Sequence, residues 1–211
     1  MGYDMETVNG PDEAEQAAVR EARARIDKLS EKRNERGKFP LEETRLKYLK
    51  AWDDLYEARR SYFRLNDWGM GECRDLMFSF GMLTEEPAPH WPEPKWFGLT
   101  DDDQLTDDPE WYDDPEERAA VEAKQTEADR AFRAAQRAVT EYDAGGIGIP
   151  AHKFYGNDGW LVTPRQITAA LTAYEKAPQA DKKAAEAAHE WWPRWIAYLE
   201  FAKDQGGFRV Y

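Results

Sequence analysis

The side chains best suited to chemistry gather in one short stretch, residues 151–166, which reads Ala-His-Lys-Phe-Tyr-Gly-Asn-Asp-Gly-Trp-Leu-Val-Thr-Pro-Arg-Gln. The imidazole of His152 could act as a general base near neutral pH, with the side chains of Asn66 and Asp158 as orienting groups. Such a trio would serve a hydrolase or a transferase that acts on a nucleotide-like ligand. This is the enzyme interpretation of the chain.

A wider set of polar and aromatic residues is expected at the edge of a small sheet. Aromatic walls with a few convergent polar groups are typical of ligand pockets. The same residues are also typical of an ordinary sheet edge, in which Asn157 and Asp158 make a turn and Arg209 pairs with a nearby carboxylate. The sequence leaves both interpretations open. The candidate ligand-binding residues are Tyr3, Asp4, Asn66, His152, Asn157, Asp158, Trp160, Arg209 and Tyr211.

Standard catalytic and metal-binding motifs are absent from the sequence. It contains no glycine-rich phosphate loop and no Gly-x-Ser-x-Gly elbow, and His189 lacks the second histidine of a zinc-protease motif. His90, His152 and His189 stand far apart, and the aspartate clusters at 101–103 and 107–108 lack the spacing of a calcium loop. We therefore expect no metal, no cofactor and no catalytic residue of a standard class.

Acidic residues are concentrated between residues 100 and 117, where there is no lysine or arginine, and this stretch holds most of the net charge of −13. No basic stripe is apparent, which argues against general nucleic-acid binding. Interleaved aromatic residues indicate a recognition surface, acting as a DNA mimic or as a docking patch for a basic protein, while a simply solvated loop fits the charge run as well. The candidate partner-binding residues are Asp101, Asp102, Asp103, Asp107, Asp108, Trp111 and Tyr112.

Hydrophobic spacing predicts long helices around which the chain is built. Residues 11–36 and 41–64 should form an antiparallel hairpin with a narrow, coiled-coil-like seam, and residues 114–143 a third long helix packed against it. Shorter helices are expected over residues 72–82 and 164–176. The long helices could also pair two copies of the chain.

Strand signals predict one small, mainly antiparallel sheet. Residues 2–8 and 208–211 alternate as strands do, and residues 151–162 read as a strand, a tight turn and a second strand. Thr163, followed by Pro164 and Gln166, has the pattern of a capping box. The fold class is therefore α+β, mostly helical. It forms a single domain over 1–211, with a long acidic, Pro- and Trp-rich loop at 84–114 inserted between helices.

Besides the apolar faces of the helices, several individual side chains are predicted to be buried or to fill gaps. Trp68 and Met70 should fill gaps between elements, Cys73 should lie buried on a helix, and Trp160 should be buried in the sheet. A single cysteine fits a reducing compartment. The first residues have neither a basic nor a long apolar segment, so we expect a cytoplasmic protein without membrane insertion.

Several segments resemble a group of uncharacterised bacterial and bacteriophage proteins. They are Met-Gly-Tyr-Asp-Met at the start, Tyr62-Phe63-Arg64-Leu65-Asn66 with Trp68-Gly69-Met70, Asn157-Asp158-Gly159-Trp160 with Val162-Thr163-Pro164, and Gly-Gly-Phe-Arg-Val-Tyr at the end. The resemblance implies a soluble, intracellular and phage-encoded or bacterial protein, and it brings no activity and no site residues.

These observations favour a non-enzymatic interaction protein that binds a host or phage protein, for instance a defence, recombination or regulatory factor. The alternative is a small enzyme or nucleotide-like ligand binder with a pocket at the small sheet. Missing motifs, uneven charge and long helices favour the first; the polar set around His152 favours the second.

Overall fold

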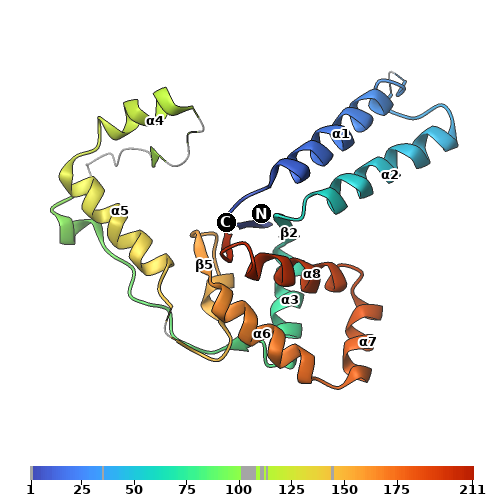
Figure 1. Cartoon of the computed structure of the whole chain (residues 1–211). Helices are drawn as coiled ribbons and strands as arrows, with labels where there is room; N and C mark the ends of the chain where they lie inside the picture. The colour runs from blue at the N-terminus through green and yellow to red at the C-terminus, as the bar shows by residue number, and fades with distance from the viewer. Residues whose placement is uncertain (1, 35, 101–107, 110–111, 113, 144) are drawn as a thin grey trace. The chain divides into compact units, whose positions relative to one another are not determined.

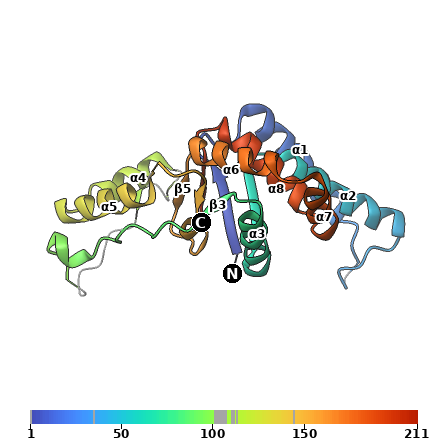
Figure 2. The ribbon, with the colours of Figure 1, turned by 90° about the horizontal axis from the view of Figure 1, so that it is seen from below.

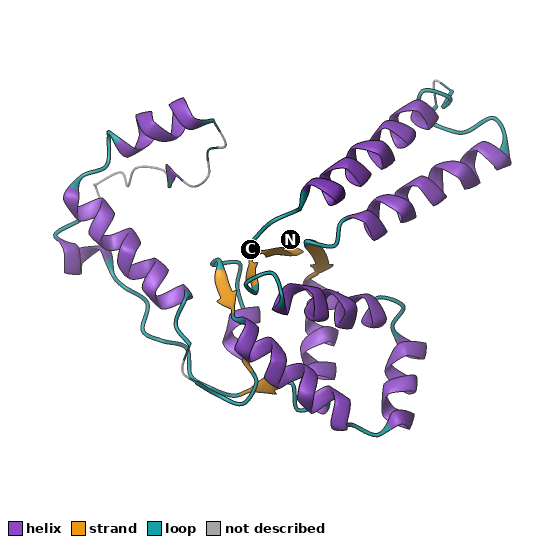
Figure 3. Ribbon diagram, in the orientation of Figure 1, coloured by secondary structure: helices purple, strands orange, loops and turns teal. Residues whose placement is uncertain are grey.

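The computed structural model describes residues 2–34, 36–100, 108–109, 112, 114–143 and 145–211. These residues form two compact units, which are described separately. The first unit contains residues 1–86 and 145–211, and the second contains residues 87–144. Helices make up most of the described chain and the strands are short (Figure 3). The fold is therefore α+β and mostly helical, as the sequence predicts.

The helices and strands follow one another in the order shown in Figure 1. They are β1 (Gly2–Thr7), α1 (Glu13–Ser30), α2 (Glu42–Ala58), β2 (Tyr62–Asn66), α3 (Asp67–Ser79), β3 (Leu83–Thr84), the 3-10 helix η1 (Pro94–Phe97), α4 (Pro115–Glu122), α5 (Glu127–Thr140), β4 (Ile149–Pro150), the 3-10 helix η3 (Ala151–Phe154), β5 (Trp160–Val162), α6 (Pro164–Lys176), α7 (Gln179–Ala188), α8 (Trp192–Lys203) and β6 (Phe208–Val210).

Both ends of the chain lie in one antiparallel sheet with the order β2-β1-β6-β5. Asp4 lies opposite Arg64 of β2, and Met5 lies opposite Val210 of β6. Trp160 of β5 also pairs with Val210. The predicted sharing of one sheet by the first strand, the last strand and the central stretch is thus confirmed. A separate pair of short parallel strands joins β3 to β4.

One face of the four-stranded sheet packs on α3, α6 and α8. Alternate residues of each strand face this core, because successive side chains of a strand point to opposite faces. At its centre the Trp195 ring of α8 lies 5.3 Å from the ring of Phe63 and 5.9 Å from that of Phe208. Helices α6 and α8 lie side by side in both Figure 1 and Figure 2. The aromatic side chains of α8 therefore hold β2 and β6 against the helical layer.

The capped helix α6 follows β5 as the sequence predicts. The Thr163 hydroxyl accepts a hydrogen bond from the Gln166 amide nitrogen, and the Gln166 side chain accepts one from the Thr163 amide nitrogen. The preceding turn ends at Gly159, whose φ of 77° lies in the left-handed region that favours glycine.

Cys73 is buried, and this burial raises the pKa of its thiol far above the usual value.

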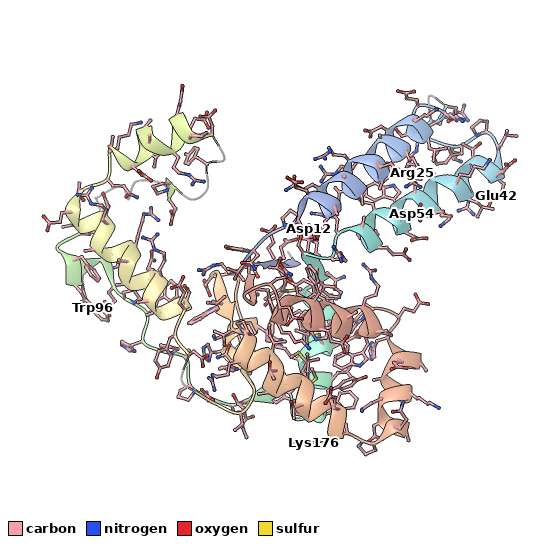
Figure 4. The ribbon with its side chains drawn as sticks, in the orientation of Figure 1. Asp12, Arg25, Glu42, Asp54, Trp96 and Lys176 are labelled. Atoms are coloured by element: carbon pink, nitrogen blue, oxygen red, sulfur yellow. The ribbon has the colours of Figure 1, made fainter. Side chains whose placement is uncertain are left out.

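The hairpin formed by α1 and α2 has a small apolar seam of its own, separate from the main core. Ala22 and Ile26 of α1 meet Ala51 and Leu55 of α2 there. Beside the seam, Arg25 and Asp54 face each other across the two helices (Figure 4), with 2.9 Å between Nη1 and Oδ2. The predicted antiparallel hairpin is therefore present, and it is held by few buried side chains.

The second unit contains η1, α4 and α5. The Phe97 ring packs edge-on against the Phe132 ring of α5, with 5.6 Å between the ring centres. Arg133 forms an ion pair of 3.4 Å with Asp108. Short elements and few apolar contacts thus hold this unit together in the described residues.

Several element boundaries differ from those predicted. The first helix covers Glu13–Ser30 instead of residues 11–36, and α3 covers Asp67–Ser79 instead of residues 72–82. The second helix ends at Ala58 instead of continuing to Arg64, and Tyr62–Asn66 is the strand β2. Its alternating burial matches pairing with β1, which outweighs helix propensity here. The third long helix is divided into α4 and α5, because Thr126 and Asp129 form a capping box that starts a new helix.

Two further predictions are wrong. Residues 151–154, expected to be the first arm of a hairpin, form the 3-10 helix η3, so within the described residues β5 pairs with β6 alone. Trp68, expected in the core, is 86 % exposed, whereas Met70 is buried. The reason is that α3 begins at Asp67, and the first turn of the helix directs Trp68 to solvent while Met70 faces the core.

Replacing Trp160 with alanine should lower the free energy of unfolding by about 3 to 5 kcal/mol, because the side chain is 5 % exposed and leaves a cavity when truncated. Trp68→Ala provides the matched control, since an exposed tryptophan should change stability by less than about 0.5 kcal/mol. Urea unfolding of both variants measures the difference. Equal effects at the two positions would contradict the burial of Trp160.

Candidate functional site

His152, the predicted general base, lies half-buried in η3. Its Nδ1 is 3.2 Å from the backbone carbonyl oxygen of Glu86. A carbonyl can only accept, so the proton lies on Nδ1 and Nε2 carries a lone pair. Nε2 is buried and has no hydrogen-bond partner among the described residues. The ring meets Trp160 edge-on, with 4.9 Å between ring centres.

Burial is the main cause that lowers the pKa of His152 below its usual value of 6.5. The positive charge of Lys153 acts in the same direction, while the hydrogen bond to Glu86 opposes it. The imidazole is therefore neutral at pH 7.

The orienting groups predicted for His152 have other partners. The Asn66 side chain caps α3 by accepting a hydrogen bond of 2.7 Å from the backbone nitrogen of Gly69. The Asp158 carboxylate accepts a hydrogen bond of 3.3 Å from Nε1 of Trp160. Asn66 thus lies on β2 and Asp158 in the turn before β5, at opposite edges of the sheet. Asn66 therefore acts as a helix cap and Asp158 as a turn residue.

Two of the other predicted residues hold the turn before β5 in place through hydrogen bonds to backbone carbonyls. Asn157 donates a hydrogen bond of 2.9 Å to the carbonyl of Gly2, and Arg209 donates one of 3.0 Å to the carbonyl of Gly159. Tyr3 packs on the main core. These contacts tie the turn before β5 to β1 and β6.

Asp4 lies on the sheet face opposite the core. Its carboxylate accepts a hydrogen bond from the Tyr62 hydroxyl and lies 3.7 Å from the Arg64 guanidinium. Its backbone exchanges two hydrogen bonds with Tyr211. The structure therefore brings Asp4 and Tyr211 together, and these backbone bonds extend the pairing of β1 with the C-terminal segment.

Most of the predicted acidic recognition surface lies outside the described residues, namely Asp101, Asp102, Asp103, Asp107 and Trp111. Of the remaining two, Asp108 is largely buried in its ion pair with Arg133, and the Tyr112 carbonyl accepts hydrogen bonds from Arg118. The recognition surface stays a prediction.

A group of interacting charged and aromatic residues lies at the base of the hairpin, where α2 passes into β2. Glu15 of α1 is only 3 % exposed. One of its carboxylate oxygens, Oε1, accepts hydrogen bonds from the backbone nitrogen and the hydroxyl of Ser61, at 3.0 and 2.6 Å. The other oxygen, Oε2, is buried without a partner in the described part of the chain. A carboxylate so placed can accept from a further donor.

Three arginines at the same base lie over aromatic rings. The guanidinium carbon of Arg59 is 3.9 Å from the centre of the Tyr62 ring. Arg60 lies 5.1 Å from the Phe201 ring, and its guanidinium also pairs with Asp12 at 3.2 Å. On α8, Arg194 lies 5.4 Å from the ring of Tyr56. A guanidinium stacked on a ring keeps its N–H edge available for an anion.

Two cavities adjoin this group and share the Arg59 and Tyr62 side chains as lining residues. The first, of about 230 Å³, is lined by Glu15 and other residues of β1 and α1. The second, of about 310 Å³, lies among α2, β2 and α8 and is lined by all three arginines. Both cavities are lined by carboxylates and guanidinium groups, with Glu15 and Arg59 in the first and Glu57 beside the three arginines in the second, so the hairpin base can hold ligands by charge-assisted hydrogen bonds.

Sequence reasoning missed this site for a definite reason. The predicted second helix extends to Arg64 and places Arg59 and Arg60 on a solvated helix face. In the structure α2 ends at Ala58, so both arginines follow the helix. Arg194 is distant in sequence and joins them only through tertiary packing. The pair Arg59-Arg60 directly before an alternating aromatic stretch is the one local signal that pointed to it.

Comparisons with protein-family models, with curated proteins and with solved structures find no match to this chain. The resemblance to uncharacterised bacterial and bacteriophage proteins therefore stays a prediction. In the described residues, no helix combines the length and the apolar character needed to cross a membrane.

Replacing His152 with glutamine should reduce the pH dependence of stability between pH 7 and pH 5. The folded state disfavours protonation of His152, so the wild type loses stability as the pH falls from about 6.5 through the lower folded pKa, and no further below it. The variant lacks this loss. Urea unfolding of the wild type and the variant at several pH values measures this loss of stability. Identical pH profiles of the two proteins would contradict a lowered pKa.

The Ser61→Ala variant should be destabilised by about 1 to 3 kcal/mol, because the buried Glu15 carboxylate loses one of its two donors. The half-buried Ser30, whose hydroxyl donates a solvent-exposed hydrogen bond to the carbonyl of Asp27, provides the control, and Ser30→Ala should change little. Thermal unfolding compares them. A Ser61 variant as stable as the control would show that Glu15 does not depend on this hydroxyl.

Proposed function

We propose that the protein is a non-enzymatic interaction protein that binds a protein partner through the outer face of α2. The observation that carries the proposal is a row of large apolar side chains left in solvent on this helix. Leu46, Leu49 and Tyr56 are 55 %, 44 % and 49 % exposed. Exposed apolar residues that form a contiguous patch are a mark of interaction surfaces.

The spacing of these residues places them on one side of the helix. Residues 46, 49, 53 and 56 are three or four positions apart, so they follow one another along a single face. Asp53 is the polar member of this row. The half-buried Trp52 borders the row on the side of the interhelix seam. The row therefore widens the apolar seam of the hairpin into an exposed strip.

Aromatic rings continue this strip along the hairpin. Phe39 contacts Tyr48 with 4.9 Å between ring centres, Tyr48 contacts Trp52 at 6.2 Å, and Trp52 contacts Tyr56 at 6.2 Å. The Arg33 guanidinium lies over the Tyr48 ring at 4.5 Å. Tryptophan, tyrosine and arginine are the residue types that contribute most binding energy at protein interfaces.

The charge of the hairpin indicates the kind of partner. Acidic and basic residues are equal in number between residues 13 and 58, although the whole chain carries −13. Several of these charges are paired within α2, as in Glu43 with Lys47 and Lys50 with Asp54. Such a surface selects its partner by shape and apolar contact. A protein that offers a hydrophobic groove to one face of a helix fits it best.

The negative charge outside the hairpin disfavours a second copy of the chain as the partner, since like charges repel. A host or phage protein, such as a defence, recombination or regulatory factor, is the partner class that we propose.

The test places a photo-crosslinking amino acid at Leu49, and at the exposed Gln179 of α7 as the control position. The captured protein is then purified and its affinity for the unmodified chain is measured. A Leu46→Ser/Leu49→Ser variant should bind it at least about tenfold more weakly, because two apolar anchors are lost. Ile147→Ser, at an exposed apolar residue outside the hairpin, should bind like wild type.

Equal crosslinking from Leu49 and Gln179 would contradict the proposal, as would unchanged affinity of the double variant. Crosslinks to a second copy of the chain would replace the foreign partner with a homodimer. Thermal unfolding of the double variant, expected to match wild type because both leucines are exposed, checks that α2 remains folded.

A further inference from the structure

We propose that the 310 Å³ cavity among α2, β2 and α8 binds a nucleoside monophosphate, with the phosphate on its arginines and the base against its aromatic walls. This cavity is distinct from the exposed strip on α2, although Tyr56 belongs to both. The inference does not depend on a protein partner, and its tests use the chain alone.

Two of its arginines are arranged to receive an anion. Arg59 and Arg194 lie over the rings of Tyr62 and Tyr56, and neither forms an ion pair in the described parts of the chain. Stacking limits the freedom of a guanidinium, so less entropy is lost when its edge binds two oxygens. Phosphate oxygens match this planar pair of donors. Arg60 adds a third positive charge while it pairs with Asp12.

The surrounding charges leave a positive balance in a strongly acidic chain. Glu57 is the carboxylate that lines the cavity together with the three arginines. Glu6 is near enough to raise the pKa of Tyr198, although it does not line this cavity. Asp12 is engaged by Arg60. An anion entering the cavity therefore meets more positive than negative groups, which favours its binding at low ionic strength.

A buried donor without an acceptor marks the same cavity. Tyr198 lines it, is 4 % exposed, and its hydroxyl has no hydrogen-bond partner in the described residues. Burial raises the pKa of this hydroxyl well above its usual value, so it stays protonated. A protonated hydroxyl donates, and unpartnered buried donors are rare in folded proteins. Within the proposal, a ligand oxygen that displaces the groups covering this hydroxyl supplies the missing acceptor.

The walls of the cavity suit a planar ring. Tyr56, Tyr62, Phe63, Tyr198 and Phe201 all line it, and its volume lies in the range of small-molecule sites. The arginines cover one face of the Tyr56, Tyr62 and Phe201 rings, and Phe63 and Tyr198 are nearly fully buried, so a base would contact the part of the first three rings that stays accessible. Inorganic phosphate would use the arginines alone and make no such contact. A nucleoside would use the rings and leave the guanidinium edges without a partner. A nucleoside monophosphate satisfies both halves of the cavity.

Isothermal titration calorimetry with AMP, GMP, CMP and UMP at low salt tests the proposal, with adenosine and inorganic phosphate as separate arms. At least one nucleotide should bind at a ligand concentration of about 1 mM, and the two separate arms should each bind at least about tenfold more weakly. The absence of binding by all four nucleotides would overturn the proposal. Inorganic phosphate or adenosine binding as tightly as the best-bound nucleotide would also overturn it.

Side-chain variants locate the binding. Arg194→Gln, on the exposed surface of α8, should weaken nucleotide binding by about tenfold through the loss of a charge-assisted hydrogen bond. Arg20→Gln is the matched control, because Arg20 is an exposed arginine of α1 that lines neither hairpin-base cavity. Equal affinity of the Arg194 variant and the control would place the ligand elsewhere and overturn the proposal.

Tyr198→Phe separates a binding role from a structural one. Since the hydroxyl has no partner in the described residues, its removal should leave the melting temperature unchanged or raised while nucleotide binding weakens several-fold. Unchanged affinity would contradict the proposal at any melting temperature, and a lowered melting temperature beside it would show that the hydroxyl serves the fold.

Discussion

The first unit depends on the position of β1 between β2 and β6. This short strand at the start of the chain holds both the strand that leaves the helical hairpin and the strand that ends the chain. Because β2 follows α2 after only a short turn, this pairing also fixes where the hairpin base lies. Glu15 can then reach Ser61, and Arg60 can reach Phe201 of α8. The candidate site is a consequence of the sheet.

The sheet in turn is held from one side by aromatic packing. Trp195 meets Phe63 from β2 and Phe208 from β6, and the ring of Phe154 from η3 lies 6.2 Å away. One side chain thus contacts three segments that are far apart in the sequence. The opposite face carries Asp4, Tyr62 and Arg64, which bond to one another. Apolar burial therefore decides which way the sheet faces, and polar pairing refines its register.

Local signals predicted the parts of the fold that local interactions create. The capping box at Thr163, the turn at Gly159 and the alternation after Gly206 all depend on residues that are neighbours in sequence. The sequence predicts helix as far as residue 64 and so misses the strand Tyr62–Asn66, because this strand depends on a partner strand at the distant start of the chain. The site at the hairpin base was missed for the same reason: Arg59 and Arg194 meet across the cavity only after α2, β2 and α8 have packed.

The pairing of β1 with β6 also sets an order of events during synthesis. Residues 5–7 have their partners in β6 only after Val210 has been made, whereas the seam of α1 and α2 uses residues that emerge early. The hairpin can therefore form on the ribosome while the sheet stays open on one side. Until then β1 presents an unpaired edge and the aromatic residues of β2 lack Trp195. A nascent chain without β6 therefore exposes a strand edge and aromatic side chains that can associate with other chains.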